Sequence, residues 1–124
     1  MGWAVRGIRG AATVDRNGSR EILEATAELL SEIVKENGIN KEDIASAVFT
    51  VTPDLDAEFP AAAARKFMDW IHVPMLCCCE IKVPGALERC IRVLVMVNTE
   101  KSQEELHHVY LGKASALRED LAAR

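Results

Sequence analysis

A single amphipathic helix is the feature that most constrains how this chain can fold. In the segment SREILEATAELLSEIVKENG, residues 19–38, apolar side chains recur at the helical period. Ser19 is suited to the N-cap and Gly38 to the C-terminal stop. The stripe that this helix is predicted to bury consists of Ile22, Thr26, Leu29, Leu30 and Ile33. A helix with one such stripe must pack it against another layer of structure.

Strand-like segments supply that second layer. Apolar and β-branched runs predict strands, and Pro60 suits the first turn of a second, short helix. The predicted strands cover residues 2–14, 44–52, 73–81, 90–99 and 107–117, and the short helix covers 61–70. This β-α-β-α-β-β-β order predicts an α/β chain, with a mixed sheet and both helices against one face. We expect one domain over residues 1–124, ending in a flexible polar tail at 118–124.

The charge of the chain limits the partners that it can bind. The 124 residues carry a formal net charge of −4, which argues against general binding to nucleic acid or to anionic membranes. No apolar stretch approaches the ~20 residues of a membrane span. Arg6 and Arg9 interrupt any apolar core of a signal peptide. A pocket with a few clustered arginines is still able to bind a small anion.

Four cysteines raise the question of a metal site. Cys77, Cys78 and Cys79 are consecutive, and Cys90 stands alone. A site built from Cys77, Cys79 and Cys90 is conceivable, but no CxxC or HxxxH spacing supports it. Small buried or half-buried thiols in a reducing cytosol are the favoured interpretation, which predicts a cytoplasmic protein without a metal. The sequence has no phosphate loop and no GxGxxG motif, so we expect no cofactor.

Arg92 is the most informative single residue, because it interrupts the apolar run IRVLVMV. A buried arginine is rare unless an anion pairs with it. Two partners fit: Glu80, near the end of the preceding strand, or an anionic group of a ligand. Arg9 in GIRGAAT poses the same question, and its alternative is an exposed position on an edge strand. Tyr110, the only tyrosine, is either half-buried core or a hydroxyl donor to a carboxylate.

Several stretches together resemble a known family. They are RGIRGAATV, TPDLDAEFPAAAAR, VPMLCCCE, GALERCIRVLVMV and HHVYL, in that order along almost the whole chain. The sequence is similar to the small monofunctional chorismate mutases of the trimeric AroH class. The resemblance implies a homotrimer whose three mixed sheets form a pseudo-α/β barrel, with active sites at the subunit interfaces. It also implies that the chain rearranges chorismate to prephenate, a step towards phenylalanine and tyrosine, without a covalent intermediate.

The resemblance further implies a role for each matching residue. Arg92 would contact the ether oxygen of the substrate and one carboxylate, and Glu80 would contact the ring hydroxyl. Arg9 and Tyr110 would hold a substrate carboxylate, and Cys77 would also approach the hydroxyl. The remaining substrate contacts would come from Phe59 and Ala61 of a neighbouring subunit, from Leu117 near the tail, and from the charges of Arg65 and Arg118 at the pocket mouth.

Two features depart from the family pattern, and one pair conflicts with regular strand geometry. Leu76, Cys78 and Cys79 replace more polar or bulkier residues of the family. Ala62 stands where the family carries a lysine after FPA, so one charge at the pocket mouth is missing. Cys77 and Glu80 should face opposite sides of a regular strand. For both to meet one ligand, the strand must end or bulge between them.

From the sequence alone, two other functions stay open. A catalytically silent trimer that binds a small anionic metabolite would use the same arginines. Such a binder would not need Glu80 to face Arg92 across the ligand. An enamine or imine hydrolase on a similar fold would need a water-activating group, and the sequence identifies none.

Overall fold

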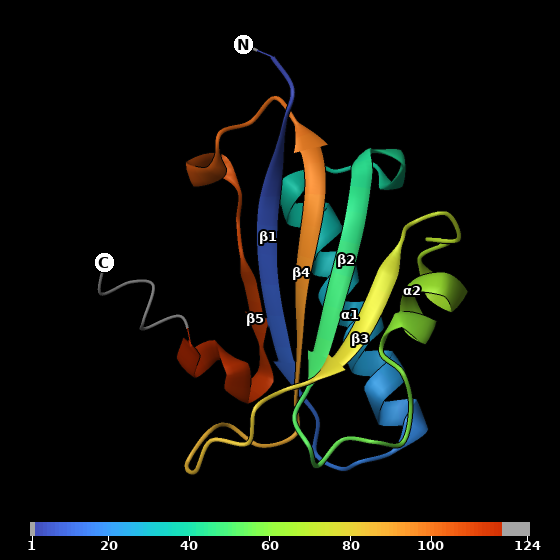
Figure 1. Cartoon of the computed structure of the whole chain (residues 1–124), viewed down its shortest axis with the longest axis vertical. Helices are drawn as coiled ribbons and strands as arrows, with labels where there is room; N and C mark the ends of the chain where they lie inside the picture. Colours follow the sequence, from blue (N-terminus) through green and yellow to red (C-terminus); the bar gives the residue numbers. More distant parts are fainter. Residues whose placement is uncertain (1, 118–124) are drawn as a thin grey trace.

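Five strands form one mixed sheet, which is accompanied by two helices (Figure 1). The computed structural model describes residues 2–117. The strands are β1 (Ala4–Thr13), β2 (Ile44–Val51), β3 (Met75–Cys79), β4 (Cys90–Thr99) and β5 (Val109–Leu111). The helices are α1 (Ser19–Asn37) and α2 (Ala61–Phe67), and short 3₁₀ helices form η1 (Lys41–Asp43), η2 (Gln103–Glu105) and η3 (Gly112–Leu117). The predicted α/β class with a mixed sheet is confirmed.

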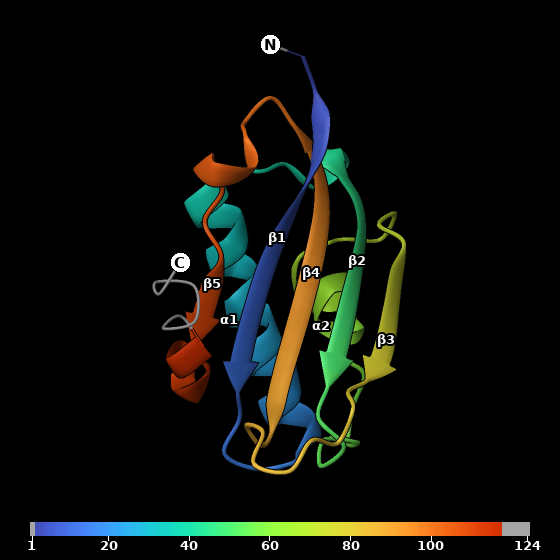
Figure 2. The same cartoon turned by 60° about the vertical axis from the view of Figure 1, so that its left-hand side comes forward.

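The strand order β3-β2-β4-β1-β5 places the long strand β4 at the centre of the sheet. β4 runs antiparallel to both of its neighbours, so that Arg92 lies opposite Ala11 in β1 and opposite Thr50 in β2. The outer strands run parallel to their neighbours, β5 to β1 and β3 to β2. Figure 2 shows β5 and η3 along one edge of the sheet and β3 along the other. The central position of β4 brings segments from both ends of the chain around Arg92.

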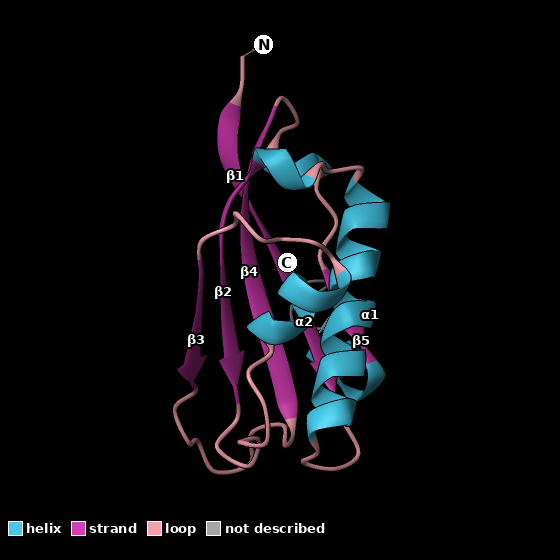
Figure 3. Cartoon of the chain, turned by 90° about the vertical axis from the view of Figure 1, so that its right-hand side faces the viewer, coloured by secondary structure: helices cyan, strands magenta, loops and turns pink. Residues whose placement is uncertain are grey.

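The sheet has one covered and one uncovered face. Both α1 and α2 lie on the same side of the strands, as predicted (Figure 3). The covered face carries the core, in which Ile8, Phe49 and Val95 have no exposed surface. Successive residues of a strand point to opposite faces, so Arg9 and Thr50 belong to the uncovered face. Arg92, which lies opposite Thr50, therefore shares with Arg9 the side of the sheet away from the helices.

Helix α1 confirms the predicted apolar stripe. Its buried residues include Ile22, Thr26, Leu29, Leu30 and Ile33. Gly38 ends the helix as predicted, with φ of 59° and its N–H donating to the Val34 carbonyl at 2.8 Å. The prediction of Ser19 as N-cap is wrong, because Gly18 occupies that position, and the Ser19 hydroxyl donates to Glu58 Oε2 at 3.1 Å. Within the described residues, no helix is long and apolar enough to cross a membrane.

The last predicted strand and the short helix both end earlier than expected. Only β5 is a strand within 107–117, because Gly112 adopts a φ of 61° and turns the chain into η3. A backbone N–H of η3 donates to Thr13 Oγ1 at 2.9 Å, which holds this turn beside the end of β1. Helix α2 ends before Trp70, which folds back into the core with 1% of its surface exposed. The turn into η3 places Leu117 beside the uncovered face.

Candidate active site

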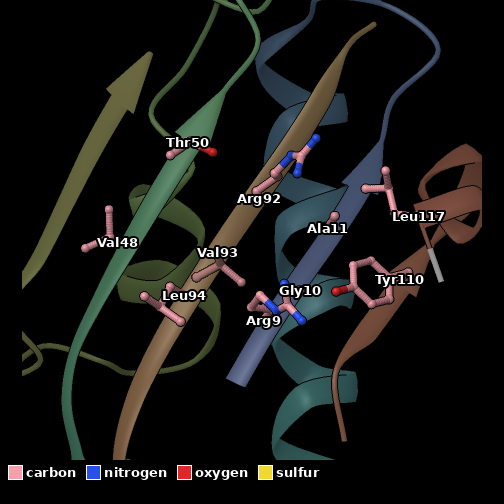
Figure 4. A pocket seen from close by; sticks show the side chains of 10 residues that line it. All are labelled: Arg9, Gly10, Ala11, Val48, Thr50, Arg92, Val93, Leu94, Tyr110 and Leu117. Carbon is pink, nitrogen blue, oxygen red and sulfur yellow. The ribbon is translucent and has the colours of Figure 1, made fainter. Parts of the chain in front are cut away.

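A pocket of about 450 Å³ lies on the uncovered face, over the centre of the sheet (Figure 4). Its lining comes from β1, β2, β4, β5 and η3. The lining residues are Arg9, Gly10, Ala11, Val48, Thr50, Arg92, Val93, Leu94, Tyr110 and Leu117. Two of these ten are arginines and most of the others are apolar, so the pocket offers positive charge within an apolar wall. Such a pocket suits a small organic anion.

Glu80 lies beside this pocket on the side of Arg92, and both residues line an adjacent hollow of about 620 Å³. It is the first residue after β3, where its backbone N–H donates to the Val51 carbonyl at 2.9 Å. Its Oε2 lies 3.2 Å from Arg92 Nε and accepts a hydrogen bond from Thr50 Oγ1 at 2.5 Å. The Glu80 side chain is 20% exposed and that of Arg92 is 44% exposed, so the pair is open to a ligand. Arg92 therefore pairs with Glu80 and also lines a pocket. The two partners considered from the sequence, Glu80 and a ligand anion, are both within its reach.

Arg9 and Tyr110 form the opposite wall of the pocket. Figure 4 shows the Tyr110 hydroxyl pointing towards the Arg9 side chain. β1 is not an edge strand, because it pairs with β4 on one side and with β5 on the other, but Arg9 is exposed and lies just before the pairing with β5, which begins at Gly10. The Arg9 backbone N–H donates to His108 Nδ1 at 2.9 Å, which fixes the main chain at this point. A second cation thus stands on a paired strand, facing the same space as Arg92.

Other predicted site residues lie at the β3 edge of the sheet. Phe59, which is 67% exposed, and Cys77 line a second hollow of about 350 Å³. Ala61 is buried at the start of α2 and Arg65 is exposed on the same helix, and neither lines either hollow. Arg118 and the predicted tail lie outside the described residues. One chain therefore brings Arg9, Arg92, Tyr110 and Leu117 together in one pocket. Phe59 and Cys77 lie in a separate hollow.

Comparison with known proteins identifies the family. The family model described as chorismate mutase type I matches residues 5–121. The chain belongs to the chorismate mutase type I family. It is 46% identical to chorismate mutase AroH of Bacillus subtilis (strain 168) over 118 residues, which are 95% of this chain and 93% of the relative. It is 48% identical to chorismate mutase AroH of Thermus thermophilus over 118 residues, which are 94% of this chain and 96% of the relative.

A solved structure from the same family agrees with the fold. A chorismate mutase from Clostridium thermocellum superposes with a TM-score of 0.87 at 50% sequence identity. The alignment covers 89% of this chain and 97% of that structure. The resemblance to chorismate mutases that the sequence motifs indicated is confirmed.

The cysteines of this type I family member occupy different environments. Cys77 packs against the core, whereas Cys78 and Cys79 are exposed. β3 ends at Cys79, between Cys77 and Glu80, but this does not bring the two side chains together. Cys77 pairs with Phe49 and packs against the core on the covered face, whereas Glu80 bonds Thr50 on the uncovered face. Burial raises the pKa of the Cys90 thiol, which keeps this thiol neutral. In the described part of the chain, no group of three or more His, Cys, Asp or Glu side chains is arranged to hold a metal ion.

Sequence reasoning missed two residues that support the site. Thr50 holds the Glu80 carboxylate, and His108 accepts the backbone N–H of Arg9. The one signal for Thr50 was a hydroxyl inside the apolar run AVFTV. The position of this hydroxyl points to the site only once the register of β2 and β4 is known, because that register places Thr50 opposite Arg92.

The hydrogen bond to His108 predicts a fall in stability at mildly acidic pH. Burial, followed by the positive charge of Arg9, lowers the pKa of His108 below its usual value of 6.5. The stability from the neutral imidazole is fully present above pH 6.5 and is lost as the pH falls through the lower pKa of the folded state. One proton limits the slope to about 1.4 kcal/mol per pH unit, and solvent screening keeps the effect below that limit.

The measurement is the free energy of unfolding between pH 7.5 and 5. The His108→Gln variant keeps an acceptor but does not titrate, so it should lose part of this pH dependence. The His72→Gln variant is the matched control, because His72 is exposed in the loop between α2 and β3 and does not contribute to the His108 pKa, and it should keep the wild-type slope. Identical slopes in wild type and His108→Gln would contradict the prediction.

Proposed function

We propose that this protein is a chorismate mutase that converts chorismate to prephenate. The observation that carries the proposal is the Arg92–Glu80 pair, joined at 3.2 Å beside a pocket that contains a second arginine. Family membership and the names of the relatives support the same activity. The substrate is a dicarboxylate with a ring hydroxyl and an enol ether, and the pocket chemistry suits each of these groups.

The reaction needs electrostatic stabilisation rather than a nucleophile. A concerted rearrangement breaks the ether C–O bond and forms a C–C bond, and no proton changes place. Negative charge develops on the ether oxygen and positive charge on the ring. Arg92 donates to that oxygen, while the Glu80 carboxylate accepts from the ring hydroxyl and stabilises the positive ring. Opposite charges fixed in advance at the two ends of the dipole favour the transition state over the substrate.

Orientation supplies the other part of the barrier reduction. Arg9 and Tyr110 bind a carboxylate and hold the side chain of the substrate over its ring. One preorganised donor is worth about 3–4 kcal/mol. An acceleration of ~10⁶ needs ~8 kcal/mol, so neither the Arg92 contact nor orientation alone suffices. Both sets of residues are therefore required in one site.

The activity is tested by mixing the purified protein with chorismate and following the loss of its diene absorbance and the formation of prephenate. An Arg92→Ala preparation, purified in the same way, shows whether the activity belongs to this chain or to a contaminant. Chorismate that binds but is not converted would indicate the silent anion-binding protein instead. No binding and no conversion would exclude both functions.

We further propose that the active form is a homotrimer, with Phe59 and Ala61 of one subunit completing the pocket of the next. Two observations support this arrangement. Phe59 lines a different hollow from the pocket arginines within one chain. The uncovered sheet face also carries exposed apolar side chains, with Leu76 66% exposed and Leu94 40% exposed. A neighbouring sheet packed there, as in a pseudo-α/β barrel, would cover this surface and join the two half-sites.

Light scattering should therefore give about three chain masses. The Leu76→Glu variant should shift the protein to smaller species and lose activity, because a charge then faces the neighbouring sheet. Ile71→Glu is the matched control, since Ile71 is equally exposed at 66% but lies in the loop between α2 and β3. It should stay trimeric and active. A wild-type monomer with full activity would contradict the shared site.

We also propose that the protein works in the cytoplasm with chorismate as its small-molecule partner, and without nucleic acid or membrane partners. The four cysteines are free thiols, which suits a reducing compartment. The net charge of −4 does not favour polyanionic partners.

A further inference from the structure

We propose that Thr50 is a positioning residue that sets the orientation of the Glu80 carboxylate in the active site. The inference rests on the proposed chorismate mutase activity and adds to it a residue that touches Glu80 rather than the reacting atoms. Thr50 lies in β2, opposite Cys78 of β3 and opposite Arg92 of β4. It is therefore the residue between the strand that leads to Glu80 and the strand that carries Arg92. Figure 4 shows its hydroxyl oxygen turned towards Arg92.

In the described part of the chain, both side-chain contacts to the Glu80 carboxylate converge on one oxygen. Thr50 Oγ1 donates to Oε2 at 2.5 Å, and Arg92 Nε lies 3.2 Å from the same atom. Among the described residues, none donates a hydrogen bond to the other oxygen, Oε1. A carboxylate oxygen accepts up to two hydrogen bonds, so Oε1 keeps its full capacity for the ring hydroxyl of the substrate. Oε2 is thus bound by Thr50 and Arg92, and Oε1 is available to accept a hydrogen bond from the substrate.

Without the Thr50 hydrogen bond, the Glu80 carboxylate would be free to rotate against the Arg92 guanidinium. The backbone of Glu80 lies just beyond the end of β3, where its own N–H is bound to the Val51 carbonyl. Over the residues that the structure describes, the ion pair with Arg92 is the one other contact that holds its side chain. Arginine and carboxylate groups favour a bidentate arrangement with two parallel hydrogen bonds. That arrangement would turn Oε1 and a terminal guanidinium nitrogen towards each other and away from the substrate.

Three variants separate this role from simple packing. Thr50→Val keeps the shape of the side chain and removes the hydroxyl, and we expect kcat to fall about tenfold, as for a lost hydrogen bond to a charged group. KM should change less than about threefold, because the Arg9 side of the pocket is intact. Thr50→Ser restores the hydroxyl without the methyl group and should recover most of kcat. Thr26→Val is the matched control: the Thr26 hydroxyl bonds the Ile22 carbonyl at 2.7 Å inside α1, so its loss should leave kcat unchanged.

A double-mutant cycle with Glu80→Gln then tests whether Thr50 acts through Glu80. In the Glu80→Gln background, Thr50→Val should lower kcat by less than about twofold, because the oriented carboxylate is already absent. A tenfold loss in that background would overturn the proposal, as would a Thr50→Val enzyme with wild-type kcat or a Thr50→Ser enzyme as slow as Thr50→Val. Should Thr50→Val fail to fold, Thr50→Ala gives the same comparison. A wild-type protein without mutase activity refutes the proposed function, whereas an active wild type that is insensitive at Thr50 refutes only this inference.

Discussion

Arg92→Lys should lower kcat by about two to three orders of magnitude while the protein stays folded. Lysine keeps the positive charge but lacks the planar fork that serves two oxygens at once. Arg92 reaches Glu80 through Nε, so its terminal nitrogens are the donors left for the ether oxygen. Lysine has no equivalent second donor at that distance from the strand. A donor misplaced by about an ångström loses much of the ~3–4 kcal/mol that a preorganised group supplies.

The measurement is kcat and melting temperature on the same preparation. Arg20→Lys is the matched control, because Arg20 is an exposed residue of α1 that pairs with Glu24 at 3.3 Å. This control should keep both values near those of the wild type, since exposed pairs contribute little to stability. An Arg92→Lys enzyme with near-normal kcat and a lowered melting temperature would show that Arg92 is only a structural ion-pair partner.

The second large effect is on the free energy of unfolding, and it comes from a substitution at Phe49, the residue before Thr50. Phe49 points to the covered face of β2 and has no exposed surface. Phe49→Ala should lower the free energy of unfolding by about 3–5 kcal/mol, because it removes a large buried side chain and leaves a cavity. Phe67→Ala makes the same change on α2 at a residue that is 59% exposed. It should cost less than about 1 kcal/mol.

Chemical denaturation of both phenylalanine variants provides the test. A loss for Phe49→Ala no larger than that for Phe67→Ala would mean that the core relaxes to fill the space. Because Phe49 and Thr50 point to opposite faces of one strand, the pair of predictions also separates the two faces experimentally. Changes on the covered face should appear mainly in stability, and changes at Thr50 mainly in kcat.

The sequence predicted those features that depend on local periodicity. The stripe of α1 follows from side chains three and four residues apart, and Gly38 follows from the left-handed turn that ends a helix. Glu80 was a foreseeable partner of Arg92 because both stand out as charges beside apolar strands. The family motifs then supplied the fold and activity, which the comparisons confirm for the family.

The features that sequence reasoning missed depend on contacts between distant segments. The N-cap lies at Gly18, and the Ser19 hydroxyl, which would have to cap the helix, instead bonds Glu58, a residue beyond β2. The last strand stopped at β5 because Gly112 turns the chain against Thr13, which lies at the other end of the sequence. The Thr50 hydrogen bond follows from strand register, which no local pattern specifies.

The pairing of β1 has a consequence for folding during translation. β1 is synthesised before its partners β4 and β5, with Thr13 opposite Cys90 and Ala4 opposite Thr99. At roughly 5–20 residues per second, about 4–15 s separate the synthesis of Thr13 from that of Cys90. During this interval both edges of the first strand lack their native neighbours, and unpaired edges promote pairing between nascent chains. Arg92 is therefore synthesised 83 residues after Arg9, and the pocket cannot form before η3, which supplies Leu117, has been synthesised.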